Sequence, residues 1–322
     1  MRTNLCPKYR YLLGGTYMDT KIIFVGNYKG GVGKTTSVLN FAEYFSRAEK
    51  KVLVLDLDPQ SSLSEILVKN NSQNGNQATE LNKLDEKKTL NYVYDLHISR
   101  IKKYNSISLK FDDDIVQEYK NGRFDFIASS LFYKDGVGLD ELAVRMEDTV
   151  EYLSILKQFL DPLLDRKRYD FVLIDCPPSN NLITRSAFLL SDYYIIPTIL
   201  DGISTNGVAH YINTVRNTYQ HYCETSPDSS LMKHFFGPRP KLIGIFCTFI
   251  RKQVDYSSEF SALKSYVEGK CKDNIYIFEE EINNYIDIAR STQVGESSLA
   301  RKDYQTLSEQ VLSRILEMER AD

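Results

Sequence analysis

The chain has 322 residues, a formal net charge of −3 and a hydrophobic content of 42%, with a sequence pI near 5.9. This length and composition are sufficient for a buried core, whereas the acidic balance argues against a broadly basic nucleic-acid-binding protein. The five cysteines lack CxxC spacing, so neither a disulfide framework nor a metal cluster is expected. Because no stretch approaches ~18 apolar residues and no signal-peptide core is visible, we expect a cytoplasmic protein.

The first motif is a glycine-rich loop between a predicted strand at 22–25 and a predicted helix. The helix is indicated by apolar residues at helical spacing, namely Val38, Phe41, Ala42 and Phe45. The loop, residues 27–36, reads NYKGGVGKTT. Its glycines let successive backbone N–H groups point at a polyphosphate, Lys34 can reach the β and γ phosphates, and the Thr35 hydroxyl can bind Mg²⁺. The loop therefore predicts a nucleotide site.

A second apolar run, residues 51–60, reads KVLVLDLDPQ and ends in Asp56 and Asp58. Apolar residues without alternation are typical of a parallel strand that is covered on both faces. Carboxylates at the carboxyl end of such a strand lie where open α/β sheets bind their ligands. A solvated strand end or a helix cap is the alternative interpretation, and for Asp56 it is about as strong as the functional one.

The middle of the chain carries fewer signals. Residues 70–91 are polar without periodicity and predict an exposed loop. The expected elements that follow are a helix at 89–103, a strand at 124–128 and a helix at 152–164. Residues 168–179 then read RYDFVLIDCPPS, which predicts a strand that ends at Asp175 because proline cannot donate to a ladder. Asp175 is expected to reach the Mg²⁺ shell.

After Asp175, strands and helices alternate. The expected elements are helices at 183–190 and 204–219, strands at 193–197, 241–248 and 275–278, a helix from Ser257 and a last helix at about 299–319. This alternation predicts an α/β fold with a mostly parallel, twisted sheet and helices on both faces. We expect one domain over 18–322, with a polar loop near 70–91. Residues 1–17 precede Met18, and they are expected to be either an upstream N-terminal extension or an artefact of start-site choice.

Three motifs together resemble the ParA/MinD family of deviant Walker A ATPases. Residues 29–35 match KGGxGK[ST], with Lys29 ahead of the usual lysine, although Tyr28 replaces the first glycine of the ordinary P-loop pattern. Residues 56–60 match DxDPQ, and residues 174–179 read IDCPPS. The ParA branch is indicated by the spacing of Thr184, Ala187, Ser191, Asp192 and Pro197.

The resemblance implies an ATPase that uses ATP and Mg²⁺, and it assigns the site. Nucleotide binding falls to Lys29, Gly30, Gly31, Val32, Gly33, Lys34, Thr35 and Thr36. Catalysis falls to Lys29, Lys34 and Asp58, with Lys29 reaching across a dimer and Asp58 positioning the attacking water. Metal binding falls to Thr35, Asp58 and Asp175.

The resemblance also implies partners. An ATP-bound homodimer would bind DNA without sequence preference. Hydrolysis stimulated by a ParB-like centromere-binding protein would release the DNA. The protein would thus be cytoplasmic and associated with the nucleoid. Arg251, Lys252 and Arg290 match regions in which related proteins contact DNA, although a solvated charged face explains each of them equally well.

The alternative is a MinD-like, membrane-associated positioning ATPase. Its relatives end in a basic amphipathic helix, whereas this chain ends in EMERAD, and anionic lipids repel acidic groups. We therefore expect no membrane partner and predict that the last helix packs onto the sheet through Tyr304, Leu307, Val311, Leu312 and Ile315.

Overall fold

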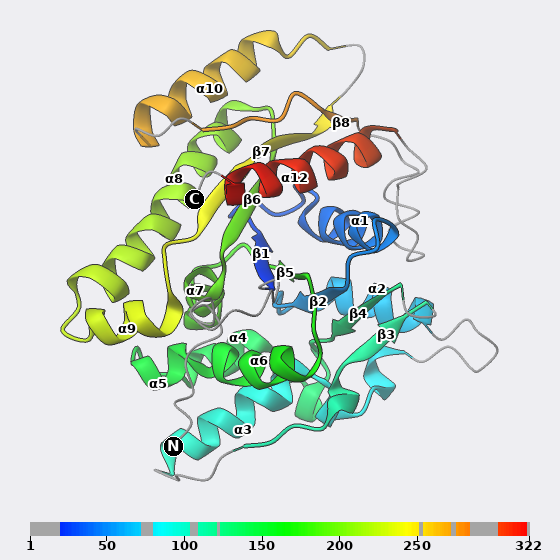
Figure 1. Cartoon of the computed structure of the whole chain (residues 1–322), viewed down its shortest axis with the longest axis vertical. Helices are drawn as coiled ribbons and strands as arrows, with labels where there is room; N and C mark the ends of the chain where they lie inside the picture. The colour runs from blue at the N-terminus through cyan, green and yellow to red at the C-terminus, as the bar shows by residue number, and fades with distance from the viewer. Residues whose placement is uncertain are drawn as a thin grey trace.

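The computed structural model of the chain describes residues 20–71, 80–103, 109–120, 123–250, 254–271, 275–283 and 302–320. These residues form an eight-stranded sheet with helices on both faces (Figure 1). The strand order is β3-β4-β2-β5-β1-β6-β7-β8. All neighbouring strands are parallel except β3 and β4. The expected mostly parallel α/β fold is confirmed.

The bounds of the elements are as follows. The strands are β1 (Lys21–Val25), β2 (Val52–Asp56), β3 (Gln117–Tyr119), β4 (Phe124–Ile127), β5 (Phe171–Asp175), β6 (Tyr193–Ile199), β7 (Lys241–Ile250) and β8 (Ile282–Asn283). The helices are α1 (Lys34–Arg47), α2 (Ser62–Asn71), α3 (Leu90–Lys102), α4 (Leu139–Val144), α5 (Val150–Leu153), α6 (Ile155–Arg166), α7 (Leu182–Leu190), α8 (Gly202–Gln220), α9 (Ser229–Phe236), α10 (Ser257–Cys271) and α12 (Lys302–Arg320). A π-helical turn, His221–Thr225, joins α8 to the segment before α9.

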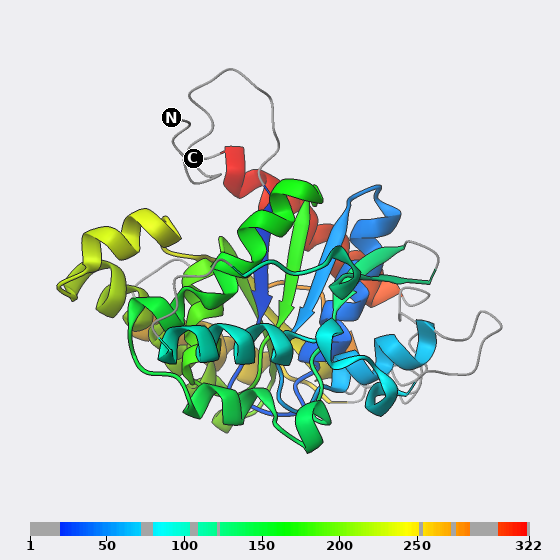
Figure 2. The same cartoon turned by 90° about the horizontal axis from the view of Figure 1, so that it is seen from below.

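Each central strand contributes to two hydrophobic clusters, one on either face of the sheet. In β1, Ile22 and Phe24 belong to one cluster, whereas Ile23 and Val25 belong to the other. Successive side chains of a strand point to opposite faces, so an unbroken apolar run is what a strand needs when helices cover both sides. Helices α1 and α12 lie on one side, and α6, α7 and α8 lie on the other (Figures 1 and 2).

Helix α12 packs against α1, β7 and β8. Tyr304, Leu307, Val311 and Ile315 are all buried, and the hydroxyl oxygens of Tyr304 and Ser37 are 3.3 Å apart. The prediction that this apolar face covers the sheet is therefore confirmed. None of the helices within the described ranges combines the length and the apolarity needed to cross a bilayer.

Several expected elements differ from the structure. The stretch 70–91 is not one exposed loop in its described part, because Asn70 and Asn71 belong to α2, two 3₁₀ turns follow residue 80, and Leu81 and Leu90 are buried. The single helix expected at 152–164 is interrupted at Ser154, which occupies the C-cap position of α5 and the N-cap position of α6.

Other differences concern edges of the sheet. The strand expected at 275–278 is reduced to one bridge between Ile277 and Ile245. Strands β3 and β8 and helices α2, α4 and α9 were not predicted. Strand β3 has only three residues, which is too short for a periodic signal.

The parallel arrangement brings the three motifs to one edge of the sheet. Asp175, the last residue of β5, is the register partner of Val25 in β1 and of Asp56 in β2. Figure 2 shows the blue strand β1 and the lighter blue strand β2 ending at the same edge. The glycine-rich loop, the Asp56–Asp58 segment and the turn after Asp175 therefore meet, as expected for a ligand site of an open α/β sheet.

Candidate nucleotide-binding site

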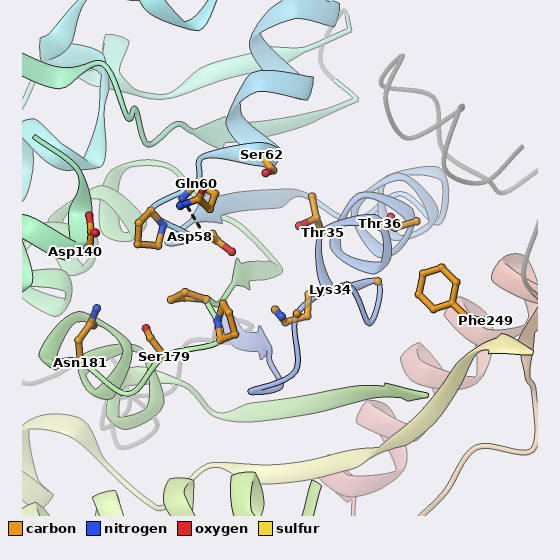
Figure 3. A pocket seen from close by; sticks show the side chains of 16 residues that line it. Lys34, Thr35, Thr36, Asp58, Gln60, Ser62, Asp140, Ser179, Asn181 and Phe249 are labelled. Atoms are coloured by element: carbon orange, nitrogen blue, oxygen red, sulfur yellow. Dashed lines mark hydrogen bonds between the residues drawn. The ribbon is translucent and has the colours of Figure 1, made fainter. Parts of the chain in front are cut away.

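A pocket of about 590 Å³ lies at this edge (Figure 3). It is lined by Gly30, Gly31, Gly33, Lys34, Thr35, Thr36, Asp58, Pro59, Gln60, Ser62, Asp140, Pro177, Pro178, Ser179, Asn181 and Phe249. Most of the predicted phosphate-binding residues and the predicted catalytic aspartate thus line one cavity. The loop residue Val32 is buried and does not line the cavity, and its carbonyl accepts a hydrogen bond from the Thr248 hydroxyl.

The loop needs glycine at two positions. Gly31 has a φ of +71° and Gly33 a φ of +82°, which is the left-handed region that disfavours side chains. Helix α1 begins immediately after Gly33, so its free N–H groups and positive dipole end face the pocket. This is the geometry of a phosphate-binding helix terminus.

Lys34 places its ammonium group in the pocket. The residue is 7% exposed, and its Nζ donates to the carbonyl of Lys29 at 3.1 Å. Burial lowers the pKa of Lys34, although the nearby carboxylates of Asp175 and Asp58 oppose this effect. Figure 3 shows Lys34 and Asp58 pointing toward the same part of the pocket. A phosphate group bound in the pocket would give the buried ammonium an anionic hydrogen-bond partner.

Thr35 and Asp175 form the predicted metal pair. The Thr35 hydroxyl donates to Asp175 Oδ2 at 2.7 Å, while Asp175 Oδ1 is buried without a hydrogen-bond partner among the described residues. Burial raises the pKa of Asp175 well above its usual range, and the charge of Asp56 adds to this. A cation near Asp175 would reverse both effects.

These residues fit Mg²⁺ only together with a nucleotide. No group of three or more His, Cys, Asp or Glu side chains within the described ranges is arranged to hold a metal ion by itself. Mg²⁺ is usually bound by one or two carboxylates together with substrate phosphates and water. Thr35 and Asp175 match that requirement.

Asp56 caps helix α2. Its Oδ2 accepts from the Ser64 N–H at 2.8 Å and from the Ser64 hydroxyl at 2.7 Å, and its Oδ1 accepts from the N–H of Asp58 at 3.0 Å. Burial raises the pKa of Asp56 to about 6. The capping interpretation of Asp56 is therefore the one that the structure supports.

Asp58 lies in a tight turn between β2 and α2. Its Oδ1 accepts from the N–H of Gln60 at 2.9 Å, which Figure 3 marks, and its carbonyl accepts from the N–H of Ser61 at 2.8 Å. The Ser129 hydroxyl, at the end of β4, lies 3.0 Å from the hydroxyl of Ser61, and the Ser129 N–H donates to Ser64. Ser64 and Ser129 thus support the turn, although sequence reasoning did not identify either residue.

Lys29 does not line the pocket of its own chain. Its Nζ lies 2.5 Å from Asp201 Oδ2 and 2.8 Å from the Ser204 hydroxyl, at the N-terminus of α8. Burial acts to raise the pKa of Asp201, but the hydrogen bonds from Lys29 and Ser204 outweigh it and bring the pKa below the usual range. Sequence reasoning missed Asp201. The available signal was the spacing of Asp201 and Ser204 before a helical pattern, which is typical of an N-cap.

Tyr28, the departure from the ordinary P-loop pattern, also contacts α8. Its ring packs edge-on against Tyr211 at 4.9 Å and lies 5.3 Å from His210. A Cβ on Gly26 would lie 1.8 Å from the Tyr211 hydroxyl oxygen, so glycine is required there. The start of the phosphate loop is therefore fitted closely against α8.

The predicted DNA contacts Arg251, Lys252 and Arg290 lie outside the residues that the structure describes. Helix α10, which comes after Lys252 in the chain, carries the exposed residues Lys264 and Lys270.

Comparison with known proteins identifies the family. A family model described as "AAA domain" matches residues 20–226. The chain belongs to this family. This AAA-domain chain is 28% identical over 205 residues to the sporulation initiation inhibitor protein Soj of Bacillus subtilis, which is 62% of this chain and 67% of Soj.

Two further matches cover almost the whole AAA-domain chain. It is 24% identical over 304 residues to a virulence plasmid ParA family protein of Chlamydia psittaci, which is 91% of this chain and 95% of that protein. The fold is similar to that of a Cyanothece McdA variant in complex with ATP, with a TM-score of 0.65 and 19% identity over 92% of this chain and 96% of that one. The expected relationship to ParA-type partition ATPases is confirmed.

Proposed function

We propose that this protein is an ATP-dependent partition ATPase. Two ATP-bound copies form a dimer that binds DNA without sequence preference, and hydrolysis separates them. A centromere-binding protein of the ParB kind stimulates hydrolysis. The proposal is supported by the relatives named Soj and ParA and by the pocket between the phosphate loop and Asp58.

The observation that carries the proposal is the position of Lys29. Its ammonium group is bound to Asp201, and the pocket is lined by Lys34 instead. A lysine on the rim of its own pocket can serve the phosphates of a second copy that docks on the same edge of the sheet. The site of one protomer would then be complete only in the dimer.

The residues of the pocket have separate roles in this proposal. Lys34 and the loop N–H groups hold the β and γ phosphates, and Asp58 orients the attacking water. Lys29 of the second copy stabilises the charge that develops on the transferred phosphoryl group. Thr35 and Asp175 would hold Mg²⁺, which would supply positive charge to offset that of the phosphates. Asp58, whose charge acts on Lys34 and which lines the same pocket, is the third residue proposed to bind the metal.

The alternative, a membrane-associated ATPase of the MinD kind, needs an apolar helix face that is free to enter lipid. The apolar face of α12 is covered by α1 and the sheet. Lipid binding through α12 would require the helix to leave the core, which costs about 1.5–3 kcal/mol for each large apolar side chain that loses its burial.

The test is co-sedimentation with DNA of random sequence, with ATP, with ADP and without nucleotide, beside anionic liposomes. We expect DNA binding with ATP and little with ADP, and a steep decrease with salt because each lost phosphate contact lowers the log-log slope by about 0.9. The double variant Arg251→Ala, Lys252→Ala should weaken binding without preventing dimerisation, and Arg290→Ala should weaken it further. Binding that ignores the nucleotide, or binding to liposomes in place of DNA, contradicts the proposal.

A further inference from the structure

A second cavity lies between the start of α5 and the segment that joins α8 to α9. It has a volume of about 850 Å³, which exceeds that of the nucleotide pocket. Figure 1 shows α5 and α9 next to each other at this place. The lining residues are Asp148, Thr149, Val150, Glu151, Leu153, His221, Tyr222, Thr225, Ser226, Pro227, Asp228, Leu231 and Met232. We call it the α5–α9 groove.

The α5–α9 groove has an apolar floor and an acidic rim. Leu153 and Met232 are buried at its base, and Leu231, which is 57% exposed, lines the same cavity. Three exposed carboxylates, those of Asp148, Glu151 and Asp228, line it, whereas its described lining includes no lysine or arginine. A ligand that satisfies both features carries apolar side chains on one face and positive charges beside them.

We propose that the α5–α9 groove binds a basic amphipathic segment of a partner protein. Apolar side chains of the segment pack on Leu231 and the floor, and its lysine or arginine side chains pair with the three carboxylates. This is the helix-in-groove mode of recognition, in which apolar anchors provide affinity and rim charges provide specificity and a fast association rate. The π-helical turn His221–Thr225 forms one wall, and such turns often mark functional sites.

The α5–α9 groove is connected to the nucleotide pocket through Arg185 of α7. Arg185 Nη1 lies 3.6 Å from Asp148 Oδ2 and donates to the Tyr222 hydroxyl at 3.1 Å, while Tyr222 donates to Asp148 at 2.6 Å. On its other side, Arg185 Nε donates to Asn180 Oδ1 at 3.2 Å.

Asn180 stands between Ser179 and Asn181, which both line the nucleotide pocket. The charge of Arg185 also acts on the Tyr28 hydroxyl of the phosphate loop. A basic side chain that pairs with Asp148 competes with Arg185 for this carboxylate. Binding in the α5–α9 groove therefore changes the contacts of Arg185 with the loop after β5. Docking itself is independent of the function proposed above, whereas the effect on the nucleotide rests on it.

The docking test uses fluorescence anisotropy of a labelled amphipathic helical peptide of leucine, alanine and lysine. The triple variant Asp148→Asn, Glu151→Gln, Asp228→Asn and the single variant Leu231→Ser should each weaken binding, the former by about tenfold, since three exposed ion pairs are lost. The matched control is Glu65→Gln, Glu279→Gln, Glu309→Gln, which removes the same charge from exposed positions elsewhere and should bind like the wild type. Thermal unfolding of each variant verifies that it is folded.

Two peptides complete the docking test. A peptide with glutamate in place of lysine, and a lysine–glycine peptide without leucine, should both bind at least about tenfold more weakly than the amphipathic probe. The docking proposal is overturned if the wild type does not bind the probe, if the control triple variant loses as much affinity as the groove variant, or if the lysine–glycine peptide binds equally well.

The link through Arg185 has its own measurement. The probe should change the dissociation rate of the fluorescent ATP analogue in the wild type, and Arg185→Ala should abolish this change while retaining peptide binding. An unchanged rate with bound peptide would overturn the link and leave the docking site standing. If the wild-type protein does not bind the ATP analogue even in the absence of peptide, that result counts against the proposed function.

Discussion

The ammonium group of Lys29 lies 2.5 Å from the carboxylate of Asp201, a residue 172 positions later in the chain. Asp201 also accepts from the N–H of Ser204 at 2.7 Å, so one side chain both caps α8 and holds the lysine that precedes the phosphate loop. In the proposed dimer, Lys29 has to leave this contact before it can reach the phosphates of a second copy. The Lys29–Asp201 pair therefore opposes dimer formation.

Asp201→Asn should favour the dimer. The substitution removes the charge that binds Lys29 but keeps an oxygen that can cap α8. Because the two side chains are 34% and 40% exposed, solvent screens the pair, and its loss is worth at most about 1 kcal/mol, or about fivefold in the dimerisation constant. Sedimentation velocity with ATP measures this. Asp113→Asn, which breaks the exposed Arg166 pair elsewhere, is the control, and weaker dimerisation of Asp201→Asn would refute the account.

Lys34→Ala should strongly weaken nucleotide binding. The buried ammonium is the positive charge aimed into the pocket, and charge-assisted hydrogen bonds to a phosphate are each worth about 1.5–3 kcal/mol, so affinity should decrease by about a hundredfold. Titration with a fluorescent ATP analogue measures the loss. Thermal unfolding should show an intact fold, and Lys69→Ala, at an exposed position of α2, should bind normally. Ordinary hydrolysis by a folded Lys34→Ala protein would overturn the site assignment.

Asp58→Ala should separate binding from chemistry. Its hydrogen bond to the N–H of Gln60 helps to hold the turn, but the phosphates are expected to contact the loop and Lys34. The variant should therefore bind ATP and accumulate as a dimer while hydrolysing slowly. Size-exclusion chromatography with ATP, combined with a phosphate-release assay, tests both points. A variant that remains monomeric with ATP would show that Asp58 is needed for the fold of the pocket or for nucleotide binding.

Asp56 should make stability depend on pH in the direction opposite to most carboxylates. Burial raises its pKa to about 6 in the folded state, whereas the unfolded value is about 3.9, so the folded protein binds the extra proton. The free energy of unfolding should decrease as pH rises through this interval, by on the order of 2–3 kcal/mol from Asp56 alone.

The measurement for Asp56 is a difference between two proteins. Urea unfolding of the wild type and of Asp56→Asn, without nucleotide, should give curves whose separation changes between about pH 4 and 6 and is constant above it. Taking the difference removes the contributions of carboxylates that do not interact with Asp56, whereas that of Asp175, whose pKa the charge of Asp56 raises, is partly retained. A separation that does not vary over this interval would contradict the raised pKa.

The sequence contains enough information for the phosphate loop and the aspartates because their chemistry depends on residues close together in the chain. A strand, a loop and a helix in succession position Lys34 and Thr35, and parallel strands must bring Asp56 and Asp175 to one edge. Contacts between distant segments give no such local signal. Asp201 lies 172 residues from Lys29, and Ser129 lies 65 residues from Ser64, so neither partner could be predicted without the fold.

The same distinction explains the errors in the elements. Periodicity predicted α3 and α8 almost to their ends, since each has several turns on which the apolar spacing repeats. The stretch 70–91 was predicted as loop because its polar residues surround isolated apolar ones, Leu81 and Leu90, whose burial depends on tertiary packing. Likewise, no glycine or proline marks the interruption at Ser154, and Leu153 and Leu156 beside it are strong helix formers.

The most direct test of the account is complementation between two inactive variants, Lys29→Ala and Asp58→Ala. In a mixed dimer, the site with intact Asp58 faces a partner with intact Lys29, whereas the other site lacks both groups. If Lys29 acts across the dimer, mixing the two proteins should restore ATP hydrolysis to a fraction of the wild-type rate, although each variant alone is inactive. If Lys29 acts within its own chain, every site remains defective and the mixture stays inactive, which would contradict the account.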